Sequence, residues 1–89
     1  MIITLAMLIV IHEEVVRETG ESNHILDKGL LESTVNIPYQ TFGGVELFPT
    51  IESKAARLFY GIVSNQIFEN GNKRTGTVAF LYFLKRNGI

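Results

Sequence analysis

The chain has 89 residues, of which 46% are hydrophobic and 19% are charged, a balance typical of a folded protein rather than a disordered one. This length fits one small domain, so residues 1–89 are predicted to form a single domain. The net charge of −1 argues against direct nucleic-acid binding through phosphate neutralisation, and the lack of cysteine excludes disulfide scaffolds, thiol catalysis and cysteine-ligated zinc.

Charge is distributed unevenly along the chain. Residues 1–46 contain seven acidic and two basic residues, whereas residues 47–89 contain two acidic and six basic ones. An anionic ligand is therefore expected in the second half. Residues 1–11 are almost entirely apolar, but they lack the basic start and the cleavage site of a signal peptide and are too short to span a bilayer. They predict a buried first helix and no contact with a membrane.

Capping residues and apolar spacing predict two helices in the first half. Thr4 is the expected N-cap of a first helix that ends at Gly20. Asp27 is the expected N-cap of a short second helix, which cannot continue through Pro38. Two adjacent glycines in residues 39–49 favour a short hairpin or flap there. The apolar face of the first helix comprises Leu5, Leu8, Ile9, His12, Val15 and Val16.

Two further helices are predicted in the second half. Thr50 is the expected cap of the third helix, whose buried face is predicted to run as far as Gln66. A loop at residues 67–71 leads to a fourth helix, which starts near Asn72 or Lys73 and ends at Gly88. Residues 78–84 are apolar on every side of this helix. We therefore expect the fourth helix to be central and to need a covering element beyond the other three helices.

The start of the fourth helix breaks two local rules. Lys73 and Arg74 place cations where the helix dipole is positive, at a cost of about 0.3–1 kcal/mol each. Gly76 lies within the helix and costs roughly 0.5–1 kcal/mol relative to alanine. Both features fit a polyanion bound by first-turn N–H groups, an ammonium and a guanidinium, with Gly71 and Gly76 allowing the backbone to come close.

Two other interpretations of this segment exist. A basic pair at a helix start can be solvated or paired with a neighbouring acid, here Glu69. A Walker A loop is excluded, because Gly71 and Gly76 have its spacing but Thr77 stands where its lysine belongs, and a helix rather than a strand precedes it.

The stretch from Gln66 to Arg74 resembles the signature of the Fic/Doc family, His-x-Phe-x-(Asp/Glu/Asn)-(Gly/Ala)-Asn-(Gly/Lys)-Arg. The continuation Lys73-Arg74-Thr75 is similar to the Doc, or death-on-curing, branch. The likeness extends over most of the chain, through residues 11–14, 38–42, 48–50 and 84–88.

The resemblance implies an all-α Fic fold and an enzyme that uses ATP and Mg²⁺ to modify a protein hydroxyl. Fic members transfer AMP, whereas the Doc branch comprises cytoplasmic bacterial toxins that phosphorylate a threonine of elongation factor Tu, stop translation, and are neutralised by a Phd antitoxin. Phe68 would anchor the loop in the core. The residues at the family's phosphate-binding positions are Gly71, Asn72, Lys73 and Arg74, so the resemblance implies that they hold the phosphates. Asn70 stands at the position that helps to place the metal ion.

The departure from the family pattern is Gln66, which stands where the family has its catalytic histidine. A glutamine amide cannot accept the proton of the attacking hydroxyl, and loss of a general base typically costs about 10²- to 10⁴-fold in rate. Asn70 is also a weaker Mg²⁺ ligand than a carboxylate. The chain is therefore expected to be either an impaired Doc-type transferase or a binding module without turnover, as a natural degenerate copy or as a variant made harmless.

Three expectations concern the rest of the chain. Doc-like proteins continue for further helices, so the chain is expected to lack C-terminal helices, through natural shortening or trimming. The exposed apolar helix at residues 78–84 then predicts homodimerisation or burial against a Phd-like antitoxin. His12 is expected to be a packed or surface histidine, because His24 alone cannot complete a zinc site with it.

Overall fold

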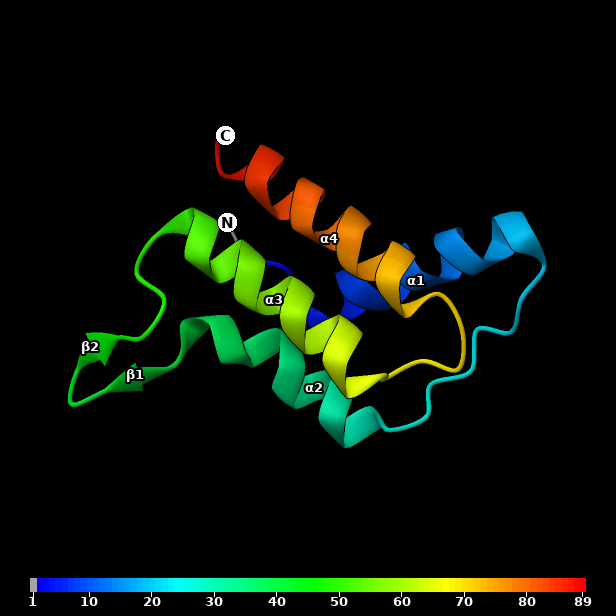
Figure 1. Cartoon of the computed structure of the whole chain (residues 1–89), viewed down its shortest axis with the longest axis horizontal. Helices are drawn as coiled ribbons and strands as arrows, with labels where there is room; N and C mark the ends of the chain where they lie inside the picture. The colour runs from blue at the N-terminus through cyan, green and yellow to red at the C-terminus, as the bar shows by residue number, and fades with distance from the viewer. Residues whose placement is uncertain (1) are drawn as a thin grey trace.

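The computed structural model describes residues 2–89, and within them helices dominate (Figure 1). The prediction of an all-α fold is confirmed. No helix among residues 2–89 has the length and apolar character needed to cross a membrane. In chain order the elements are α1 (Leu5–Thr19), α2 (Lys28–Asn36), the 3₁₀ turn η1 (Ile37–Tyr39), β1 (Thr41–Phe42), β2 (Val45–Glu46), α3 (Ile51–Asn65) and α4 (Asn72–Arg86).

The caps predicted for the first three helices are confirmed. The side chains of Thr4 and Asp27 accept hydrogen bonds from first-turn N–H groups of α1 and α2. Thr50 and Ser53 form a reciprocal capping box at the start of α3. Gly20 ends α1 with a φ of 72°, a left-handed conformation that glycine adopts without steric cost. Each side-chain cap typically stabilises its helix by about 1 kcal/mol.

Close helix contacts explain two of the glycines. A Cβ atom added to Gly76 would lie 3.1 Å from Val63 Cγ2 and 3.2 Å from Phe59 Cδ2, so Gly76 lets α4 pack closely on α3. A Cβ atom on Gly61 would lie 2.9 Å from Thr34 Cγ2, which shows that α2 and α3 also approach closely. The prediction that Gly76 allows an anion to approach is therefore wrong, because its missing side chain faces α3.

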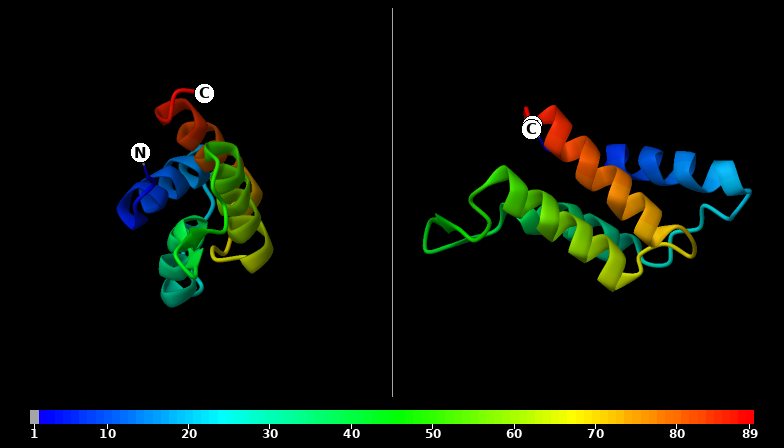
Figure 2. Two further views of the ribbon diagram at one scale, coloured as in Figure 1. Left: turned by 90° about the vertical axis from the view of Figure 1, so that its left-hand side faces the viewer. Right: turned by 45° about the horizontal axis from the view of Figure 1, so that its top comes forward.

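One hydrophobic core connects the four helices and the loop before α4. The helix α4 packs on α3 and α1, and α2 likewise packs on α3 and α1. The short hairpin β1–β2 projects beyond the helices (Figure 2). Phe42, the last residue of β1, is 81% exposed. The buried core residues are Ile3, Leu8, Leu31, Val35, Ala55, Leu58, Ile62, Ile67, Phe68, Ala79 and Phe83.

The helix α4 is only partly covered, as expected for a helix that needs a covering element beyond the other three. Ala79 and Phe83 are buried, but Val78 is 43% exposed and Leu81 is 58% exposed. Among the described residues, α3 and α1 pack on α4 but cover only part of its surface, which agrees with the predicted need for a further covering element. An open apolar stripe remains along the outer side of α4.

Candidate functional site: the signature loop and the start of α4

The signature loop, residues 66–71, joins α3 to α4. It begins at Gln66, which has a φ of 49° and is the one non-glycine residue of the described chain with a positive φ. This conformation costs about 1–2 kcal/mol for an ordinary side chain. It also turns Gln66 out of the buried stripe of α3, and the residue is exposed. The prediction that Gln66 faces the core is therefore wrong.

The segment before α2 holds the signature loop from one side. The N–H of Leu26 donates to the carbonyl of Ile67 over 2.8 Å, and the N–H of Glu69 donates to the carbonyl of His24 over 3.0 Å. These two bonds form a short antiparallel bridge between residues 24–26 and the loop. The loop is thus anchored by backbone pairing that does not depend on side-chain identity.

The side chain of Asn72 closes the signature loop from the other side. Its Oδ1 accepts from the N–H of Phe68 over 3.0 Å, and its Nδ2 donates to the carbonyl of Phe68 over 2.8 Å. Phe68 itself is buried, as expected for an anchor of the loop in the core. Both groups of the Asn72 amide are therefore committed to the loop, while its role in phosphate binding stays a prediction.

A buried histidine from α1 also contacts the signature loop. The ring of His12 stacks on Phe68, with centroids 3.6 Å apart and planes inclined by 9°. His12 Nε2 lies 2.9 Å from the carbonyl oxygen of Asn70. Because a carbonyl only accepts hydrogen bonds, Nε2 carries the proton. Burial lowers the pKa of His12 below its usual value, which favours the neutral ring.

Of the two placements expected for His12, packed or surface, the structure shows the packed one. The sequence does not predict its contact with the loop. His12 and Asn70 are 58 positions apart in the chain, and no spacing rule connects residues at such a distance. Among the described residues, no cluster of His, Asp and Glu could hold a metal ion.

The start of α4 differs from those of the other helices. Gly71, with a φ of 77°, precedes α4, and no side chain caps its first turn. A Cβ atom on Gly71 would lie 3.1 Å from Val16 Cγ1, so both the backbone conformation and the packing require glycine. Lys73 and Arg74 lie in this first turn and are exposed. First-turn N–H groups and two cations therefore gather at one helix end, a combination that favours anions.

Arg74 has an acidic partner within the chain. It forms an ion pair with Glu21, which follows α1. Hydrogen bonds from Thr19 and Arg74 lower the pKa of Glu21. The alternative in which the basic pair is neutralised by Glu69 is therefore wrong for Arg74. An exposed ion pair of this kind contributes little to stability, so a phosphate could replace Glu21 as the partner of Arg74.

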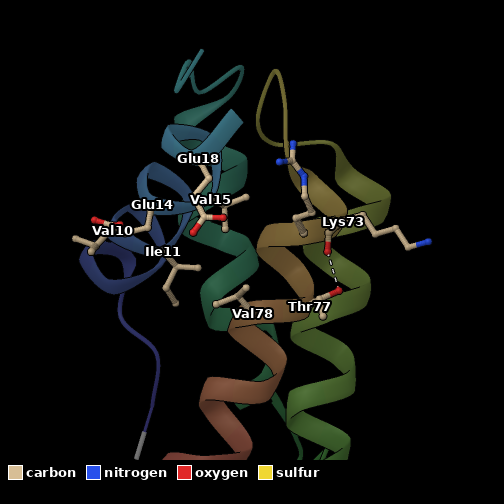
Figure 3. Close-up of a pocket in the computed structure, with 9 residues that line it drawn as sticks. Val10, Ile11, Glu14, Val15, Glu18, Lys73, Thr77 and Val78 are labelled. Atoms are coloured by element: carbon tan, nitrogen blue, oxygen red, sulfur yellow. Dashed lines mark hydrogen bonds between the residues drawn. The ribbon is translucent and has the colours of Figure 1, made fainter. Parts of the chain in front are cut away.

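A groove of about 650 Å³ lies between α1 and the first half of α4 (Figure 3). Acidic side chains of α1 and basic residues of α4 border it, and an apolar surface lies between them. The side chain of Lys73 extends away from α1 (Figure 3). The groove is lined by Val10, Ile11, Glu14, Val15, Glu18, Lys73, Arg74, Thr77 and Val78.

Residues 2–84 match the family model described as the Fic/DOC family, and the chain belongs to this family. Over 70 residues it is 38% identical to a protein described as Toxin Doc from Mycolicibacterium smegmatis (strain ATCC 700084 / mc(2)155). These residues make up 79% of this chain and 54% of the relative, so the chain spans about half the length of that toxin. No solved structure matches the chain closely enough to count as a relative.

Proposed function

We propose that the chain is a Doc-type toxin that binds ATP at the start of α4 and transfers a phosphate to a hydroxyl of a translation factor such as elongation factor Tu. Membership of the Fic/DOC family and the similarity to Toxin Doc support this proposal. The observation that carries it is the uncapped first turn of α4 with Lys73 and Arg74 exposed beside it. Such an arrangement suits the phosphates of a nucleotide.

The residues present fit ATP better than they fit a metal ion. Backbone N–H groups of the first turn, Lys73 and Arg74 would hold the phosphates, while the missing side chain of Gly71 faces Val16 of α1. Mg²⁺ would take the Asn70 amide oxygen as its protein ligand, with phosphate oxygens and water completing its shell. Bound ATP supplies the phosphoryl group, and Mg²⁺ neutralises part of its charge. Metal binding is therefore expected to depend on the nucleotide.

The side chain of Gln66 is expected to limit the rate of phosphate transfer by this chain. Its amide can orient a substrate hydroxyl by hydrogen bonding, but it cannot accept the proton. We therefore expect slow transfer by the chain as it stands. The alternatives are a binding module without turnover, which Gln66 itself favours, and transfer of AMP as in the Fic branch of the family.

Binding of ATP is expected to depend on Arg74 more than on Gln66. Arg74→Ala should weaken ATP binding by about tenfold, because a charged two-pronged donor is lost, whereas Gln66→Ala removes one neutral amide and should have less effect. Isothermal calorimetry measures both. Arg17→Ala removes an equal charge from the exposed face of α1 and should leave the affinity unchanged. Equal losses in the first two variants, or no binding by the parent chain, would contradict the proposed phosphate site.

We also propose that the groove between α1 and α4 receives a segment of a Phd-like antitoxin. The apolar floor of the groove, with Val78 at its α4 side, suits the apolar face of an amphipathic helix. Glu14 and Glu18 would face basic residues of that helix, and Arg74 would face an acidic one. This partner is cytoplasmic in toxin–antitoxin modules, as the toxin would be.

Val78→Glu is expected to weaken antitoxin binding by at least about 30-fold, because it places a charge in the apolar centre of the groove. Val78 is partly exposed, so the variant should still fold. Leu47→Glu changes an exposed leucine outside the groove and serves as the control. Biosensor binding measures the affinities. A concentration-dependent dimer that Val78→Glu dissociates would instead identify a second copy of the chain as the occupant.

A further inference from the structure

One side chain outside the signature motif makes two contacts with the signature loop. His12 lies in the third turn of α1 and is only 1% exposed. Its ring stacks on the side chain of Phe68, and its Nε2 donates to the carbonyl of Asn70. The two contacts lie on either side of Glu69, whose own side chain is exposed.

The hydrogen bond to Asn70 acts on the geometry of the next residue. The carbonyl of Asn70 belongs to the planar peptide unit that contains the N–H of Gly71. Holding this carbonyl therefore fixes the orientation of the peptide that enters the left-handed Gly71 turn, where φ is 77°. Because α4 begins directly after Gly71, the direction of its first-turn N–H groups depends on this peptide.

We propose that His12 is a positioning residue, which orients the Asn70–Gly71 peptide and the Phe68 side chain so that the first turn of α4 is preorganised for phosphate. The proposal rests on the function proposed above, because it assigns His12 a part in nucleotide binding. His12 touches neither nucleotide nor substrate; it acts through the loop. A preorganised site binds more tightly, because ordering the loop no longer opposes binding.

Two substitutions distinguish the ring stacking of His12 on Phe68 from its hydrogen bond to the carbonyl of Asn70. His12→Phe keeps a buried ring against Phe68 but removes the donor to Asn70. His12→Gln removes the ring but places an amide donor near the position of Nε2. The control is Ile3→Ala. Ile3 is buried like His12 but lies nine positions before it, and its backbone contacts the Tyr39 hydroxyl.

In His12→Phe we expect the amides of Phe68 and Glu69 to exchange hydrogen about tenfold faster, and ATP to bind about tenfold more weakly. His12→Gln should recover a large part of the ATP affinity, which a purely packing role would not allow. Ile3→Ala should lower global stability without a selective effect on the loop or on ATP. Loop exchange and ATP affinity in His12→Phe that change no more than in Ile3→Ala would overturn the proposal.

The unaltered protein provides a test that does not depend on how the variants fold. The Nε2–H proton of His12 should be detectable by NMR as a slowly exchanging resonance, and it should shift as ATP is added. A His12 resonance unaffected by saturating ATP would overturn the positioning role. If the parent protein binds no ATP, the proposed function fails, whereas the amide exchange of His12→Phe still decides whether His12 orders the loop.

Discussion

Replacing Gln66 with histidine is expected to raise the rate of phosphate transfer by about 10²- to 10⁴-fold, because it restores a general base at the position where the family has one. Histidine titrates close to neutral pH and can accept the proton of an attacking hydroxyl. The backbone favours the change as well. Residue 66 is left-handed, with a φ of 49°, and histidine adopts this region more often than most residues with a side chain.

The measurement is transfer of label from ATP to purified elongation factor Tu, with label placed on the γ-phosphate in one reaction and on the α-phosphate in another. Gln66→Asn is the matched control, because asparagine also tolerates the left-handed conformation but cannot accept a proton. We expect γ-label transfer by Gln66→His and no gain for Gln66→Asn. Transfer of the α-label would assign the chain to AMP transfer. No transfer by Gln66→His would show that more than one catalytic group is missing.

Local signals in the sequence predict most of the fold. Thr4, Asp27 and Thr50 each precede an apolar periodic segment, and each is an N-cap in the structure. The hairpin at residues 41–46 follows from two adjacent glycines. These features depend on residues within one helical turn or one tight turn, so the chain order is enough to find them.

Contacts between distant segments could not be predicted in the same way. The Arg74–Glu21 ion pair joins residues 53 positions apart, and the His12 hydrogen bond joins residues 58 positions apart. The apolar periodicity of α1 correctly places His12 on the buried face, but it does not say which residue lies opposite. Composition likewise shows that residues 78–84 are apolar, whereas the exposure of Leu81 depends on which helices pack on α4.

The motif predicts a candidate site, but the sequence does not separate the structural residues of that site from the residues proposed to bind. Asn72 belongs to the signature and is predicted to bind phosphate, yet its amide is bonded to the backbone of Phe68. Gly76 lies just beyond the signature and packs against α3. The exposed residues Lys73 and Arg74 therefore remain as the side chains available to an anion, together with first-turn N–H groups.

Phe68→Ala is expected to lower the free energy of unfolding by about 3–5 kcal/mol, the usual cost of removing a buried aromatic ring. Phe68 is 1% exposed, lies in the core cluster and supports the ring of His12. A domain of this size has a total stability of about 5–15 kcal/mol, so the variant should be close to unfolding at 37 °C. The loss should exceed that of any single exposed substitution, because the cavity opens where α1, the signature loop and residues 24–26 meet.

Urea denaturation followed by circular dichroism measures the change. Phe42→Ala is the matched control, because it removes the same ring from an 81% exposed position and should alter stability by less than about 0.5 kcal/mol. Phe68→Leu refills part of the cavity and should recover part of the loss, but it lacks the aromatic face that stacks on His12. Equal stabilities for Phe68→Ala and Phe42→Ala would mean that the signature loop is not anchored in the core through Phe68, and the orientation of the first turn of α4 would then need another cause.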